Sequence, residues 1–144
     1  GDVYKRQVSA GSFACESVLN VVGAKRIAVI SPYFPVSDKN VILFFQDCGF
    51  EVVRFRGLKC SSPIAIAQVQ ENYLRDCIAE MDGDDVDAFV QVGTNLSMCK
   101  LCAELEIEYD KPFVAINAAT YWHALRAVGI NDQFPSHGTI FEKH

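Results

Sequence analysis

Apolar residues along this chain follow two patterns that alternate with each other. From Ser9 to Val22 they recur every three or four residues, whereas Arg26 to Ile30 is a short run rich in Ile and Val. The first spacing predicts an amphipathic helix, which Gly23 can end in a left-handed conformation. The second run lacks polar alternation, which is typical of a parallel strand covered on both faces.

The same alternation continues after this first helix and strand. Ser37 or Asp38 is expected to cap a second helix that ends at Gly49, and the run Phe50 to Phe55 predicts a second strand. A third helix is predicted by side chains at helical spacing, namely Ile66, Val69, Tyr73, Cys77 and Met81.

The second half of the chain repeats the pattern. An acidic turn, Asp82 to Asp85, should end the third helix, and Ala88 to Val92 predicts a third strand. A further helix leads to a fourth strand, Phe113 to Ile116, and Asn117 is expected to cap a last helix that runs to about Val128. Strands that alternate with crossover helices predict an α/β fold, a doubly wound four-stranded parallel sheet.

Polar, mostly uncharged residues follow each predicted strand. Because ligands of open parallel sheets bind beyond the carboxyl ends of the strands, these residues form the candidate site. They are Ser31, Pro32 and Tyr33 after the first strand, residues 59–62 after the second, Gly93, Thr94 and Asn95 after the third, and Asn117 with Thr120 after the fourth.

The segment Gly93, Thr94 and Asn95 carries the most specific prediction. If a helix begins there, its free backbone N–H groups and the Thr94 hydroxyl can bind an anion such as a carboxylate. Tyr33 follows a proline and can point its phenol at the same opening, and Asn117 can offer its amide. Simpler roles stay open, because Thr94, Asn95 and Asn117 can merely cap helices and Tyr33 can pack on a loop.

Composition and charge narrow the class of partner. The chain has 144 residues, half of them hydrophobic, which suffices for the core of one domain. Its 13 basic and 18 acidic residues give a net charge of −5 without a basic run, so nucleic acid is not expected. The longest apolar run, Val41 to Phe45, is too short to span a membrane, and no glycine-rich nucleotide motif is present.

Three further patterns favour structure over chemistry. The six cysteines lie in apolar, helix-patterned segments, so most are expected to be buried thiols in a reducing cytoplasm. Cys99 and Cys102 form a CxxC pair expected about one turn inside a helix, which favours neither zinc binding nor redox chemistry. Asp82 to Asp87 lacks the glycine and glutamate of a calcium loop and is expected to be a solvated turn, and His123 is expected to pack within the last helix.

A set of short motifs between about Ser9 and Ile130 carries a family resemblance. The motifs are Gly23–Val29, Ser31–Tyr33, Gly49–Val53, Asp87–Phe89, Gly93–Leu96, Glu104–Glu106, Lys111–Pro112, Asn117–Thr120 and Trp122–Arg126. In this order they resemble the aspartate/glutamate racemase superfamily, and within it the branch of maleate cis-trans isomerase and arylmalonate decarboxylase.

The resemblance implies one half of a two-part enzyme. Members of this superfamily consist of two pseudo-symmetric α/β halves with the active site between them, and each half typically supplies a cysteine at a strand end. This chain resembles the C-terminal half, with residues 8–144 as the domain and residues 1–7 as a non-native leader. The first catalytic cysteine would then lie in an N-terminal half-domain, which is the expected partner, and a homo-oligomer is also possible.

The implied chemistry uses thiols and no cofactor. One thiolate adds to, or deprotonates, the carbon next to a substrate carboxylate, and the opposite thiol acts as the acid. The resemblance places Tyr33 on the family's substrate-binding tyrosine, and Thr94 and Asn95 on the residues after its second cysteine. The substrate-binding set expected here is Ser31, Tyr33, Ser62, Gly93, Thr94, Asn95 and Asn117.

The chain departs from the family pattern at the second cysteine. Gly93 stands at that position, so no catalytic residue is assigned in this half, and Cys99 is expected roughly 9 Å further along a helix. Ser61 or Ser62 replaces a family asparagine.

These departures leave several functions open. The first is the C-terminal half of an isomerase or lyase acting on small carboxylates, most like maleate cis-trans isomerase. The alternatives are an arylmalonate decarboxylase-like or amino-acid racemase-like enzyme, a non-catalytic carboxylate-binding relative, and a flavodoxin-like domain that binds phosphate.

Overall fold

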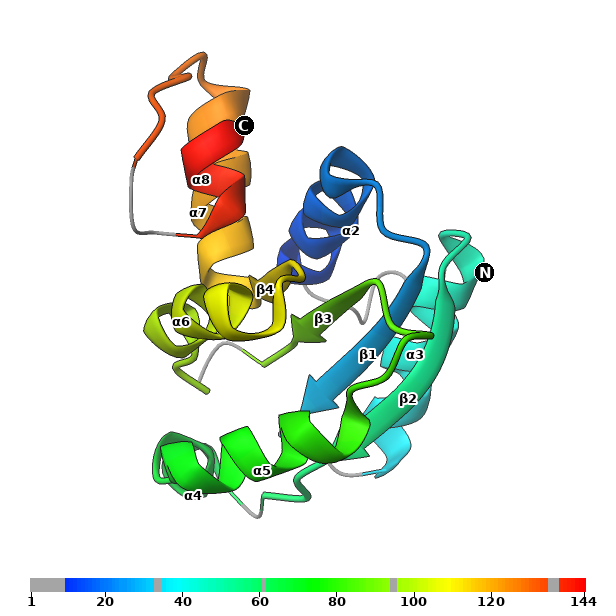
Figure 1. The fold of residues 1–144 in the computed structure, drawn as a ribbon. Coiled ribbons are helices and arrows are strands. Elements are labelled where there is room, and N and C mark those ends of the chain that lie inside the picture. Colours follow the sequence, from blue (N-terminus) through cyan, green and yellow to red (C-terminus); the bar gives the residue numbers. More distant parts are fainter. Residues whose placement is uncertain (1–9, 33–34, 61, 94–95, 135–137) are drawn as a thin grey trace.

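The chain folds into a parallel sheet covered by helices on both faces (Figure 1). The computed structural model describes residues 10–32, 35–60, 62–93, 96–134 and 138–144. The strands, in the order β2-β1-β3-β4 across the sheet, are β1 (Arg26–Ser31), β2 (Glu51–Gly57), β3 (Ala88–Gln91) and β4 (Phe113–Ala115). All neighbouring pairs are parallel, which confirms the predicted four-stranded α/β sheet.

The helices lie on both faces of the sheet, because right-handed connections change face where the strand order reverses after β2. One face is covered by α2 (Ala10–Val22), α3 (Pro35–Asp47), α7 (Ile116–Ala127) and α8 (Thr139–Lys143). The other is covered by α4 (Pro63–Ala67), α5 (Glu71–Met81) and α6 (Cys99–Tyr109). The two apolar cores therefore lie on opposite sides of β1 and β3, whose side chains are buried on both faces.

Aromatic side chains fill much of both cores. Phe44 and Phe45 of α3 are fully buried and meet edge to face, with ring centroids 5.3 Å apart. On the opposite face Phe89 of β3 stacks on Phe113 of β4, with centroids 4.5 Å apart. Each such ring removes a large apolar area from water, which stabilises the layered arrangement.

The acidic turn lies at the amino ends of the strands and is not merely solvated, as the sequence led us to expect. Asp87 accepts hydrogen bonds from the backbone N–H groups of Lys25 and Arg26, at 3.1 and 2.8 Å. Asp85 pairs with an arginine of β2 at 2.8 Å, and Asp82 pairs with Lys111 at 2.6 Å. The turn thus ties β1, β2 and β4 together through its carboxylates.

Four predicted helix boundaries are wrong, and each for a local reason. The second helix begins at Pro35, a residue type favoured in a first helical turn, so Ser37 and Asp38 lie inside it. The predicted third helix is interrupted: α4 ends at Ala67, and α5 begins only after Gln70, whose backbone is extended. Tyr73, one of the side chains whose spacing predicted this helix, is 48% exposed.

The other two boundaries lie near the candidate site. The helix after β3 begins at Cys99, with Met98 as its N-cap, so it does not start at residues 93–95. The last helix begins at Ile116, and its N-cap is Ala115 rather than Asn117. His123 of this helix is exposed and does not pack in the core. The prediction that most cysteines are buried is wrong for half of them, since Cys48 and Cys60 are half-buried and Cys99 is exposed.

Among the described residues, no helix is long and apolar enough to cross a membrane. In the same part of the chain, no group of three or more His, Cys, Asp or Glu side chains is arranged to hold a metal ion. All six cysteines are free thiols.

Candidate functional site

The predicted site residues follow the carboxyl ends of the strands, as expected for this fold. Gly93 comes two residues after β3, is buried, and has a φ of 91°, a conformation that favours glycine. Ser31 ends β1, and Asn117 is the second residue of α7, which follows β4 directly. Tyr33, Thr94, Asn95 and Ser61 lie outside the described residues, so their places in the site stay predictions.

Hydrogen bonds fix the backbone around Gly93. The Val92 N–H donates to the Ile30 carbonyl at 3.0 Å, and the Leu96 N–H donates to the Gly93 carbonyl at 3.2 Å. The Gln91 side-chain amide donates to the carbonyls of both Val92 and Gly93, at 2.8 Å each. The loop after β3 is therefore held from both of its ends.

Two helices begin beside this loop without a side-chain cap. The N-cap residues of α6 and α7 are Met98 and Ala115, and neither makes a side-chain cap hydrogen bond. The first N–H groups of a helix have no partner within the helix, and the helix dipole adds partial positive charge there. Two such ends at the same edge of the sheet favour an anion more strongly than one.

Ser31 is placed differently from what its predicted role in substrate binding would suggest. Its side chain is fully buried, and its hydroxyl donates to the Asp38 carboxylate at 2.7 Å. Burial raises the pKa of Asp38, and the Ser31 hydroxyl and Lys59 act in the opposite direction. Gly57 leaves room for this carboxylate, because a Cβ there would overlap the second Asp38 oxygen.

Ser62 has a structural role in the part of the chain that the structure describes. It caps α4, accepting a hydrogen bond from the Ala65 N–H at 3.1 Å. Asn117 is half-buried and lies in the first turn of α7. Thr120, one turn further on, donates its hydroxyl to the Ile116 carbonyl at 2.7 Å and so faces its own helix.

Cys99 is the first residue of α6, not a residue one turn inside the helix, as predicted. Desolvation of the Cys99 thiol raises its pKa, and the nearby Ala118 backbone in the first turn of α7 lowers the pKa by a smaller amount. Cys102 is deeply buried, which raises its pKa further. Both thiols therefore stay protonated at neutral pH, which argues against a redox pair even though the motif does begin a helix.

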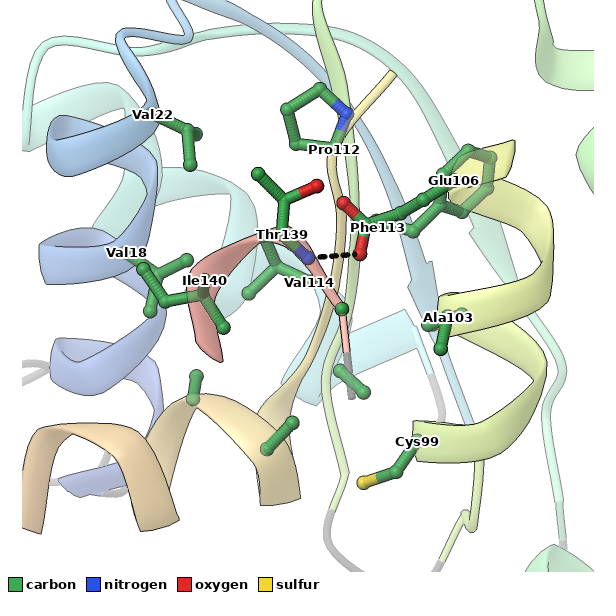
Figure 2. Close-up of a pocket in the computed structure, with 15 residues that line it drawn as sticks. Val18, Val22, Cys99, Ala103, Glu106, Pro112, Phe113, Val114, Thr139 and Ile140 are labelled. Carbon is green, nitrogen blue, oxygen red and sulfur yellow. Dashed lines mark hydrogen bonds between the residues drawn. The ribbon is translucent and has the colours of Figure 1, made fainter. Parts of the chain in front are cut away.

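An apolar hollow lies along the outer edge of β4, between α2, α6 and α8 (Figure 2). Val18, Val22 and Ile140 line it, and Cys99 points into its lower end. Glu106 on its wall accepts a hydrogen bond from the Thr139 N–H at 3.0 Å, which holds the C-terminal segment against α6. This hollow offers aliphatic walls rather than donors, so it does not suit a carboxylate.

Sequence reasoning missed three residues of this region. Gln91 interrupts an otherwise apolar strand, a signal that marks it as a residue with a specific partner. The sequence predicts Asp38 only as a helix cap and places Cys99 one turn inside its helix. Both predictions are wrong because the starts of these two helices are misplaced.

Comparisons with known proteins agree with this architecture. A family model described as arylmalonate decarboxylase matches residues 8–141. Maleate isomerase from Pseudomonas putida (strain KT2440) is 29% identical over 133 residues, which cover 92% of this chain and 52% of the relative. The chain thus spans about half the length of the curated relatives it matches.

Solved structures of similar proteins also match nearly all of this chain and only part of their own length. The crystal structure of a variant of maleate isomerase from Pseudomonas putida S16 with maleate superposes with a TM-score of 0.86 at 29% identity, covering 92% of this chain and 53% of that chain. A crystal structure of arylmalonate decarboxylase gives a TM-score of 0.83 at 22% identity and covers 93% and 60% of the two chains.

Proposed function

Because the chain belongs to the arylmalonate decarboxylase family, we propose that it forms the carboxylate-binding half of a cofactor-independent isomerase or lyase acting on small carboxylates. Maleate is the substrate we favour, since a relative of 29% identity was solved with it. Residues 8–144 form this C-terminal half in the proposal, and an N-terminal half-domain is its partner.

One observation carries the proposal, the convergence of uncapped donors at the carboxyl ends of β3 and β4. The first turns of α6 and α7 begin there without side-chain caps, beside the backbone of Gly93. Such donors bind one or two carboxylate groups without a metal ion or a charged side chain. In the proposal Tyr33, Thr94, Asn95 and Asn117 add polar contacts, and Ser31 and Ser62 support the loops that carry them.

These residues bind and orient the substrate, and the reactive thiol comes from the partner half. When a thiolate adds to one alkene carbon of maleate, the electron pair of the double bond moves toward the far carboxylate. Backbone N–H donors at that carboxylate stabilise the charge that develops there. Rotation about the new single bond, followed by loss of the thiolate, gives the trans isomer.

A non-catalytic carboxylate-binding relative is the second candidate. It is favoured by Gly93, which stands at the position of the second family cysteine and has a φ of 91°. A side chain is strained in that conformation, so the loop is adapted to a residue without one.

An NMR titration of the ¹⁵N-labelled chain tests the carboxylate site. Maleate and malonate should shift the amide signals of Gly93 and of the first turn of α7, and inorganic phosphate should compete weakly. Tighter binding of phosphate than of either dicarboxylate would instead favour the flavodoxin-like alternative. No shift with any of these anions would reject the carboxylate site.

A further inference from the structure

The sheet leaves two carbonyl groups near Gly93 without their ordinary partners. β1 and β3 pair with Ile30 opposite Gln91, and the Val92 N–H donates to the Ile30 carbonyl. The next bond of this parallel ladder would run from the N–H of residue 32 to the Val92 carbonyl. Residue 32 is a proline, which has no N–H, so this carbonyl needs another donor.

The Gly93 carbonyl loses its partner on the other side of β3. Gln91 lies opposite Ala115 of β4, so the next ladder donor would come from Ala118. Residue 118 belongs to α7 instead of β4, and its N–H does not donate to the Gly93 carbonyl. The sheet therefore ends on both sides of Gly93 at once.

The Gln91 side chain replaces both missing donors. It is 2% exposed, and its amide nitrogen lies 2.8 Å from each of the two carbonyl oxygens. Two carbonyl acceptors fix which end of this amide is the nitrogen. The amide oxygen is buried and has no hydrogen-bond partner among the described residues, so the side chain is kept here despite the cost of that unpaired group.

This arrangement also determines where the Gly93 N–H lies. The C=O and N–H of a trans peptide point in opposite directions, so a Val92 carbonyl held by Gln91 leaves the Gly93 N–H on the β4 side. There β4 has ended and α7 begins with its uncapped first turn. Within the described residues, no acceptor pairs with the Gly93 N–H.

We propose that Gln91 is a positioning residue for the carboxylate site: it holds the Val92 and Gly93 carbonyls so that the Gly93 N–H joins the donors of α7. The inference rests on the proposed function for its ligand, but its structural part is independent of any ligand. This role needs no thiol at position 93, since the backbone supplies the contact.

The test compares Gln91→Met, which removes both donors at similar size, with Ile30→Val, which trims the residue opposite it in the same buried layer. The rate of hydrogen exchange of the Leu96 amide reports how firmly the Gly93 backbone is held, because that N–H donates to the Gly93 carbonyl. Gln91→Met should speed this exchange by about tenfold relative to the Val92 amide, and Ile30→Val should leave that ratio unchanged. Equal ratios in the two variants would overturn the inference.

Gln91→Glu adds a readout that a merely structural role would not produce. A protonated carboxyl can donate to one carbonyl, whereas an ionised one faces both with acceptors only. The Leu96 amide should therefore lose its protection in this variant as pH rises, relative to the wild-type chain at the same pH. A pH-independent ratio would contradict the assignment.

The effect of Gln91 on ligand binding is tested with malonate as the probe. Gln91→Met should weaken the malonate-dependent shift of Gly93 by about tenfold in apparent Kd, with Ile30→Val near wild type. No shift in the wild-type chain would reject the carboxylate site and the ligand part of the inference, while Leu96 exchange still decides whether Gln91 holds the loop. Binding that is unchanged in Gln91→Met would reject the positioning role alone.

Discussion

At the scale of single residues, the backbone angle of Gly93 decides what a substitution there can achieve. With a φ of 91°, any side chain at this position is strained. A thiol therefore cannot be restored here without moving the loop that Gln91 holds.

Gly93→Cys is thus expected to destabilise the chain by about 1–2 kcal/mol without giving it racemase activity. Gly93→Ala serves as the matched control, because it imposes the same backbone strain without a thiol. Urea denaturation should give similar losses for both variants. A stable Gly93→Cys chain with new activity would show that the loop adapts easily.

Asp38 gives a pH dependence whose sign follows from its burial. The folded-state pKa of this carboxyl is raised above its ordinary value of 3.8, so the folded chain holds the proton more tightly than the unfolded chain. Stability then falls as pH rises from the ordinary pKa through the raised one.

Asp38→Asn should remove this loss, because the neutral amide oxygen can still accept from the Ser31 hydroxyl. We expect a higher Tm than wild type at pH 7 and a smaller difference near pH 4, both measured by circular dichroism. Asp76→Asn, at an exposed position of α5, is the control for a general change in charge. A lower Tm for Asp38→Asn at pH 7 would mean that the ionised form is needed.

At the scale of elements, the join between β1 and β3 depends on Asp87. Its carboxylate accepts from two backbone N–H groups and the Arg26 guanidinium, and these contacts lower its pKa. A lowered folded-state pKa contributes stability above the ordinary value of 3.8, and this contribution is lost as pH falls.

Asp87→Ala should cost about 1 kcal/mol at pH 7, a modest value because the side chain is partly exposed. The difference from wild type should shrink as pH falls below 4. Asp84→Ala, in the same turn, should be nearly neutral. Equal effects of the two substitutions would show that the turn acts through its net charge rather than through hydrogen bonds.

The helices and strands also show how much of the fold can be predicted from the sequence. The strands were predicted nearly to their ends, because unbroken apolar runs and the glycines after helices are local signals. The starts of α3, α6 and α7 were not. Pro35 is the first residue of α3, and the N-caps of α6 and α7 are Met98 and Ala115, whose side chains cannot cap a helix. The role of Gln91 could not be derived locally, since it depends on a proline in β1's extension and on where β4 ends.

At the scale of the whole molecule, we expect this chain by itself to convert no maleate to fumarate. The proposed thiolate belongs to the other half, and none of the described residues near Gly93 replaces it. Proton NMR of the olefinic signals measures the conversion, with a full-length maleate isomerase as the positive control. Conversion by the chain alone would show that one half holds a complete active site.

The separation of charge from the candidate site affects how an anion reaches it. The acidic turn lies at the amino ends of the strands, and β1, with six residues, spans about 20 Å between it and the opposite edge. That distance exceeds the electrostatic screening length of about 8 Å at physiological ionic strength. A dicarboxylate therefore approaches the carboxyl ends of the strands without feeling the acidic turn in ordinary buffer. In nearly salt-free solution, where screening extends to about 30 Å, the net charge of −5 slows its arrival.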